Sequence, residues 1–228
     1  MTIYQLTDQL LFPNPEEAEP EGILAVGGDL TAERLLLAYR KGIFPWYSAG
    51  QPILWWSPDP RLLLYLSEIH ISKSLRRIIN SQRFEIRFDT NFDRVIKNCA
   101  LVYRKNQDGT WITEQMRQAY GQLFQDGYAH SVESYFEGEL VGGLYGLSIG
   151  KAFFGESMFS NKSEASKIAL VALVEKLTLW DFHFIDCQVP TDHLKQMGAV
   201  EVERSLFLEQ LKQASMAESI RGPWTLDE

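Results

Sequence analysis

The amino-acid sequence predicts an α+β protein that consists of two unequal domains. Glycine and proline residues crowd the first sixty positions, whereas patterns typical of strands and helices alternate beyond Phe84. We therefore expect a small, irregular N-terminal α/β domain over residues 1–61 and a larger domain over residues 62–228, divided at Pro60-Arg61. Hydrophobic residues make up 45% of the chain, which is enough for a substantial core.

The order of the expected elements indicates what the larger domain is. They are helices over residues 31–42, 72–81, 93–102 and 114–125, strands over 131–137, 140–149 and 152–159, a helix over 161–180, and strands over 183–189 and 200–207. Thr31 can cap the first helix and Gly42 can end it. Asn161 and Glu164 have the spacing of a capping box. Two helices, a three-stranded meander, a helix and a strand are typical of an acetyltransferase-like (GNAT-like) mixed-sheet domain.

The charge distribution limits how the protein could bind RNA. A net charge of −8 argues against binding by the surface as a whole, so an RNA contact requires a local basic cluster. Lys73, Arg76 and Arg77 fall at i, i+3 and i+4 of the helix expected over residues 72–81, and therefore share one face. This face could contact phosphates. The alternative is an ordinary solvated helix face.

Motifs for metals and cofactors are incomplete. The segment 146–152 lacks the glycine spacing and the final Ser or Thr of a phosphate loop. The histidines and the two cysteines, Cys99 and Cys187, lack the spacing of metal ligands or of a disulfide framework. The segment 159–166, where an acetyltransferase binds the coenzyme A pyrophosphate, contains no glycine. We expect no metal and no cofactor. Without a signal peptide or an apolar run of ~20 residues, we expect a cytoplasmic protein.

Nine segments, taken together, carry a resemblance to a known family. They are EGILAVGGDL (21–30), GIFPWY (42–47), PILWWSPDPR (52–61), HISKS (70–74), TWIT (110–113), HSVE (130–133), LVGGLYG (140–146), FGESMFS (154–160) and IDCQ (185–188). In this order they resemble the leucyl/phenylalanyl-tRNA–protein transferase family from about Phe12 to Phe207. The resemblance implies a small N-terminal domain before an acetyltransferase-like domain, and no coenzyme A.

The resemblance also implies a reaction. Leu or Phe would move from aminoacyl-tRNA to the α-amine of proteins that begin with Arg or Lys, which would mark those proteins for degradation. We expect Met to be a weaker donor, because an apolar pocket discriminates by only ~1–3 kcal/mol per methylene. We expect a monomer with no membrane partner. A coenzyme A-dependent N-acyltransferase and a non-catalytic tRNA-binding module are the alternatives.

The matched motifs imply a role for individual residues. The implied reaction centre is Asp186, Gln188 and Glu156. The implied contacts to the 3′-terminal adenosine of tRNA are Trp46, Trp111, Tyr39, Tyr120 and Ser160. The expected pocket for the transferred side chain consists of Met158, Ile185, Leu144, Leu170 and Leu173. The basic face of Lys73, Arg76 and Arg77 would contact the tRNA backbone.

The residues themselves leave alternatives open. Asp186 and Gln188 alternate with Cys187, so we expect both polar side chains on one face of the strand. Asp186 would then accept or orient the amine proton, and Gln188 would hold the substrate carbonyl or fix the carboxylate; alternatively, Asp186 caps a neighbouring loop. Glu156 could contact the basic acceptor or could pair with Lys167. Tryptophans at turns stack on bases or fill a core.

Overall fold

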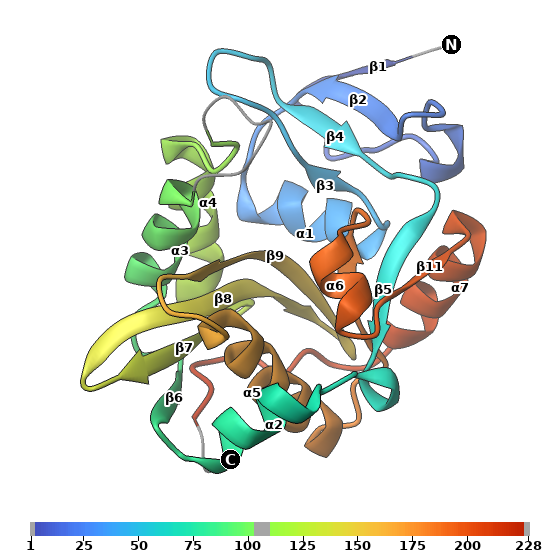
Figure 1. Cartoon of the computed structure of the whole chain (residues 1–228). Coiled ribbons are helices and arrows are strands. Elements are labelled where there is room, and N and C mark those ends of the chain that lie inside the picture. The colour runs from blue at the N-terminus through green and yellow to red at the C-terminus, as the bar shows by residue number, and fades with distance from the viewer. Residues whose placement is uncertain (1–2, 103–109, 226–228) are drawn as a thin grey trace.

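The computed structural model describes residues 3–102 and 110–225, and within these residues the strands form two sheets (Figure 1). The smaller sheet lies at the N-terminus and has the order β1-β2-β4-β3. Its strands are β1 (Tyr4–Leu6), β2 (Ile23–Gly27), β3 (Phe44–Pro45) and β4 (Leu54–Trp56), with a 3-10 turn, η1 (Pro15–Glu17), after β1. The neighbours β1 and β2 are parallel, and β4 runs antiparallel to both β2 and β3.

The larger sheet contains seven strands in the order β11-β5-β10-β9-β8-β7-β6. They are β5 (Arg61–Tyr65), β6 (Phe84–Phe88), β7 (Ala129–Phe136), β8 (Glu139–Ile149), β9 (Ala152–Ser160), β10 (Phe184–Gln188) and β11 (Val200–Val202). Strands β6 to β9 form an antiparallel run, whereas β10 lies parallel to β9. The protein is therefore an α+β protein with mixed sheets.

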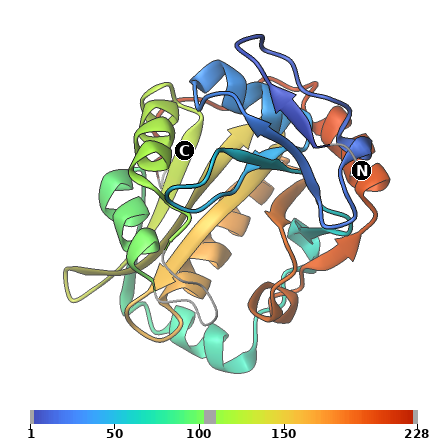
Figure 2. The same cartoon turned by 90° about the horizontal axis from the view of Figure 1, so that it is seen from above.

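Helices cover both faces of the larger sheet (Figure 2). They are α1 (Ala32–Arg40), α2 (Lys73–Asn80), α3 (Phe92–Leu101), α4 (Glu114–Gln125), α5 (Ala165–Leu179), α6 (Asp192–Gln196) and α7 (Arg204–Ala214), with a 3-10 turn, η2 (Leu66–Glu68), after β5. Helices α3 and α4 pack on one face and α5, with α2 beside it, on the other, so the sheet separates two hydrophobic cores. No helix in the described ranges is both long and apolar enough to cross a bilayer.

Most of the expected helices and strands are confirmed, and the N-terminal region is the main correction. The helices expected over residues 31–42, 72–81, 93–102 and 114–125 correspond to α1 to α4, with Thr31 capping α1 as predicted. The first sixty residues, expected to form an irregular α/β domain in which only one helix was placed, contain a four-stranded sheet. Its strands span two to five residues each, which is too short for a clear alternation of apolar and polar positions.

Two expectations at the C-terminal end are wrong. Asn161 and Glu164 do not form a capping box, because Glu164 is itself the residue that precedes α5, has a left-handed φ of 68°, and makes no capping hydrogen bond with its side chain. The strand expected over residues 200–207 ends at Val202, and Arg204 begins α7. The apolar residues of that segment are divided between β11 and α7: Val200 and Val202 belong to the strand, whereas Phe207 is buried on the helix.

The pairing of β9 with β10 determines where the sheet opens. The two parallel strands pair only from Ala152 opposite Phe184 to Phe154 opposite Asp186. Beyond that point β9 continues to Ser160 and stays paired with β8 on its other side. The two strands therefore diverge after Asp186, and residues of both strands beyond this point line a cavity together with residues of α5 and α6.

The tail after α7 returns to the body of the protein through Trp224. This side chain is 2% exposed, and its ring stacks on His130 with ring centroids 3.7 Å apart. Its backbone N–H donates to Asp89 Oδ2 at 2.7 Å, and the same oxygen lies 2.8 Å from His130 Nδ1. The tail, in which the sequence shows no motif, is therefore part of the core beneath α5.

We predict that Trp224→Ala lowers the free energy of unfolding by about 3–5 kcal/mol, because it removes a buried aromatic ring that packs on four neighbouring rings. Denaturation in urea measures the change. Met216→Ala is the matched control, since Met216 belongs to the same tail and is 84% exposed; its effect should stay within ~0.5 kcal/mol. Equal stability of the two variants would mean that the tail does not contribute to the core.

Candidate active site

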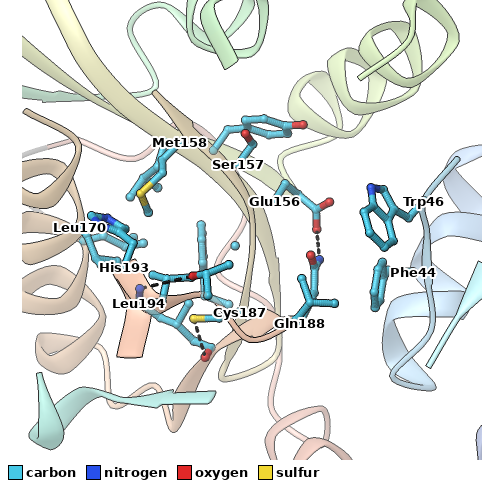
Figure 3. Close-up of a pocket in the computed structure, with 18 of the residues that line it drawn as sticks. Phe44, Trp46, Glu156, Ser157, Met158, Leu170, Cys187, Gln188, His193 and Leu194 are labelled. Atoms are coloured by element: carbon cyan, nitrogen blue, oxygen red, sulfur yellow. Dashed lines mark hydrogen bonds between the residues drawn. The ribbon is translucent and has the colours of Figure 1, made fainter. Parts of the chain in front are cut away.

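A cavity of about 350 Å³ lies where β9 and β10 diverge (Figure 3). Its walls come from β3, β8, β9, α5, β10 and α6, and from Trp111 before α4. Glu156 and Gln188 lie on the side of Phe44 and Trp46, whereas Met158, Leu170 and Leu194 lie on the opposite side (Figure 3). The cavity therefore has one aromatic and polar end and one apolar end.

The apolar end contains all the residues expected to hold the transferred side chain. These are Leu144, Met158, Leu170, Leu173 and Ile185, which come from four different elements. Phe153, Leu194 and the polar residue His193 also line this end and were not predicted. Leu194 belongs to the short helix α6, which the sequence analysis did not predict because five residues carry too little periodicity. An apolar recess of this kind can bind an aliphatic or aromatic side chain by shape.

The carboxylate of Glu156 is held by three donors. Tyr39 Oη donates to Oε1 at 2.7 Å, and Tyr120 Oη donates to Oε2 at 3.0 Å. Gln188 Nε2 donates to Oε1 at 2.9 Å, which is the dashed contact between the two strands in Figure 3. Both tyrosine side chains are fully buried behind Glu156. Their hydroxyls therefore fix the carboxylate, whereas the resemblance implied that they lie against adenosine.

Burial raises the pKa of Glu156 to about 7, although the hydrogen bonds from Tyr39, Tyr120 and Gln188 oppose this shift. Near neutral pH the carboxyl is therefore poised to exchange a proton. The alternative pairing of Glu156 with Lys167 is wrong, because the Lys167 ammonium instead lies 2.9 Å from Glu164.

Asp186 and Gln188 lie on the same face of β10, as their alternation with Cys187 predicted. Asp186 pairs opposite Phe154, which belongs to the core on the side of α3 and α4. Gln188 bonds Glu156, whose other donors, Tyr39 and Tyr120, belong to that core too. The register of β10 against β5 shifts between these two residues, and Gln188 has a left-handed φ of 63°. A bulge of this kind bends the strand and changes the direction of the side chains next to it. As a result both Cys187 and Gln188 line the cavity, whereas Asp186 is fully buried away from it.

Asp186 forms a buried ion pair with Arg61, a residue that the sequence analysis quoted in a motif but gave no role. Arg61 Nε donates to Oδ1 at 2.9 Å and Nη2 donates to Oδ2 at 2.6 Å. Both side chains are 0% exposed. Asp186 therefore cannot accept a proton directly from a substrate in the cavity. An arginine that begins the apolar run of β5 was the available signal, since a buried arginine requires an anionic partner.

The residues expected to contact adenosine are only partly together. Trp46 and Trp111 both line the cavity, and Trp46 packs edge-to-face on Trp56 with centroids 5.6 Å apart. Ser160 is exposed at the end of β9 and is not among the lining residues. Its hydroxyl donates to the Lys162 carbonyl at 2.7 Å, which shapes the turn into α5.

The basic residues of α2 lie outside the cavity. Lys73, Arg76 and Arg77 are exposed, whereas Leu75 is buried and packs in the core beneath α5. The helix thus presents a positive face to solvent, as its periodicity predicted. Among the described residues, no group of three or more His, Cys, Asp or Glu side chains is arranged to hold a metal ion.

Comparisons with known proteins agree on one family. Residues 63–212 match the family model described as leucyl/phenylalanyl-tRNA protein transferase, and residues 28–59 match the model of its N-terminal domain. The leucyl/phenylalanyl-tRNA–protein transferase of Desulfatibacillum aliphaticivorans is 52% identical over 100% of this chain and 97% of its own. That of Syntrophobacter fumaroxidans is 58% identical over 91% and 89%, respectively.

Among solved structures, a conserved protein of unknown function from Staphylococcus epidermidis is similar with a TM-score of 0.43 and 10% identity. The match covers 79% of this chain and 68% of that one.

We predict that Glu156 makes stability depend on pH. Its pKa in the folded protein, about 7, lies above its ordinary value of 4.5, so between these values the folded state binds more protons than the unfolded state. The stabilisation from Glu156 is therefore fully present below about pH 4.5 and is lost as the pH rises to about 7.

The measurement compares the free energy of unfolding of the wild type with that of Glu156→Gln at several pH values. The wild-type advantage should shrink by about 3 kcal/mol across this window, at ~1.4 kcal/mol per unit of pKa difference. A difference between the two proteins that stays constant with pH would contradict the assignment.

Proposed function

This chain belongs to the leucyl/phenylalanyl-tRNA protein transferase family, and on that premise we propose that its cavity joins an aminoacyl ester to a protein α-amine. The protein is an aminoacyltransferase that takes its donor from aminoacyl-tRNA and modifies proteins. The observation that carries the proposal is the placement of the apolar recess beside the hydrogen-bonded pair of Glu156 and Gln188. The donor side chain enters the recess, and its ester carbonyl lies at the polar end.

The chemistry requires positioning more than a strong base. An aminoacyl ester is already activated, and an α-amine with a pKa of ~7.7–8.0 is about one-tenth neutral at pH 7. Holding the ester and the amine in contact can supply up to ~7–11 kcal/mol. The C–N bond forms as the ester C–O bond breaks, and the proton lost by the amine is gained by the 3′ oxygen of the tRNA.

Gln188 and Glu156 are the groups suited to orient the amine. The Gln188 amide nitrogen is engaged by Glu156, which leaves the amide oxygen to accept a hydrogen from the attacking amine. Glu156, with its pKa near 7, can hold or release a proton beside them. Asp186 acts only through its neighbours in this proposal, because Arg61 occupies both of its oxygens.

Substrate recognition follows from the two ends of the cavity. We propose that the recess favours side chains without a branch at Cβ, with Leu and Phe as donors and Met as a weaker one. Trp46 and Trp111 would stack on the terminal adenosine, with ~1–3 kcal/mol for each contact. Ser160 would lie near the same nucleotide. Acceptor proteins would begin with Arg or Lys, and a basic N-terminus suits a chain of net charge −8. Transfer of the amino acid would mark these proteins for degradation.

We extend the proposal to the architecture. The parallel strands β9 and β10 diverge after three paired positions, which supports an acetyltransferase-like fold for residues 62–228. The change from the four-stranded to the seven-stranded sheet between Trp56 and Arg61 supports a separate domain over residues 1–61.

The turn before α5 contains no glycine and places Glu164 at the helix start, which disfavours binding of a coenzyme A pyrophosphate there. Because the donor is aminoacyl-tRNA, we propose that the protein acts in the cytoplasm. We also propose that it acts as a monomer.

The direct test is transfer of labelled leucine or phenylalanine from aminoacyl-tRNA to a peptide that begins with Arg. We expect label on the peptide, less label with methionyl-tRNA, and none on a peptide that begins with Glu. Acetyl coenzyme A is supplied in a parallel reaction. Acetylation of the peptide would support an N-acyltransferase instead, and binding of tRNA without transfer would support a binding module.

We predict that the double charge reversal Arg76→Glu, Arg77→Glu weakens tRNA binding and flattens its dependence on salt. Each lost phosphate contact should reduce the slope of log K against log salt by about 1. The matched control is the double variant Lys41→Glu, Lys212→Glu, which changes the same charge at two exposed positions on other elements. Identical slopes in the two double variants would exclude α2 as the tRNA contact.

A further inference from the structure

Arg61 is a fully enclosed charged side chain next to the cavity. It begins β5, has no exposed surface, and uses three of its nitrogens in hydrogen bonds. Two of these bonds hold Asp186, and the third runs from Nη1 to the Gly42 carbonyl oxygen at 3.2 Å. The guanidinium also lies over the rings of Phe44 and Phe207, at 4.8 and 4.5 Å from their centroids.

The residues that Arg61 contacts belong to segments on two opposite sides of the polar end of the cavity. On one side, Gly42 and Phe44 belong to the turn and strand that carry Trp46 into the cavity. On the other side, Asp186 Oδ1 also accepts the backbone N–H of Gln188 at 2.9 Å. A single guanidinium therefore links the turn before β3 with the bulge in β10.

The bulge requires such support. Gln188 has a φ of 63°, which residues other than glycine adopt only when surrounding contacts impose it. The hydrogen bond from its backbone to Asp186 is one such contact, and Arg61 fixes the carboxylate that accepts it. With the backbone turned in this way, the Gln188 side chain reaches Glu156 across the gap between β9 and β10.

We propose that Arg61 is a positioning residue for the transfer reaction: through Asp186 it holds the Gln188 amide against Glu156, and through Gly42 and Phe44 it sets the distance to the opposite wall. This inference rests on the proposed function, because it assigns Arg61 to the same reaction centre. Arg61 touches no reacting atom, so it affects the rate only through the geometry of its neighbours.

The first test compares two conservative substitutions of fully buried arginines, Arg61→Lys and Arg34→Lys. Arg34 is the matched control: it bonds the carbonyls of Thr7 and Gln9 in the N-terminal region and does not line the cavity. For Arg61→Lys we expect kcat for transfer to fall about 10²-fold, the cost of misplacing reacting groups by about 1 Å. The affinity for tRNA should be unchanged. Wild-type kcat in Arg61→Lys, or an equal loss in Arg34→Lys, would overturn the inference.

A second variant separates positioning from folding. Arg61→Met combined with Asp186→Leu removes both buried charges while keeping apolar volume, an exchange that is often neutral for stability. We expect this double variant to unfold at about the same urea concentration as the wild type and to transfer about 10²-fold more slowly. Wild-type turnover by a stably folded double variant would show that the ion pair serves only the fold.

A third measurement needs no substrate and therefore does not depend on the proposed function. Infrared spectroscopy follows the titration of the Glu156 carboxyl, identified by its absence in Glu156→Gln. Because the bond from Gln188 lowers the pKa of Glu156, its loss in Arg61→Lys should move that pKa upwards. Arg34→Lys should titrate like the wild type. An unmoved titration in Arg61→Lys would overturn the inference even if transfer itself is confirmed.

Discussion

The divergence of β9 from β10 is the constraint on which the cavity depends. Two parallel strands that stay paired leave no space between them, whereas here the pairing stops at Asp186 and most of the lining residues of β9 and β10 lie beyond that point. Each strand keeps another partner, since β9 pairs with β8 along its whole length and β10 pairs with β5. The sheet thus stays continuous on both sides of the opening.

The two carboxyl groups beside this gap, those of Glu156 and Asp186, both have hydrogen-bond donors within the protein. Glu156 is enclosed by two buried tyrosine hydroxyls and by the Gln188 amide, so its carboxylate has donors although little water reaches it. Burial still dominates the balance and brings its pKa to about 7. Asp186, by contrast, sits against a guanidinium. The two buried carboxyl groups of one site therefore have different partners and, in our proposal, different tasks.

The candidate site was partly visible in the sequence. The apolar residues Leu170 and Leu173 were named from a loosely patterned helix, and they line the cavity together with Met158 from β9. The tyrosines were expected near the nucleotide, but they are buried behind Glu156. The pairing partner of Asp186 could not be deduced, because Arg61 is 125 positions away in sequence and no local pattern connects them.

Local pattern alone determined the four helices before β7, the hairpin of β7 and β8, and the positive face of α2, because each follows from periodicity and capping within a short segment. The order of the motifs was enough to indicate the family. Only the tertiary structure decided that Arg61 covers Asp186 and that a bulge directs Gln188 towards Glu156, whereas alternation alone had placed both residues on one face of β10. It also decided the short N-terminal strands and the burial of Trp224. These depend on contacts between distant segments, and such contacts leave no periodic trace in the chain.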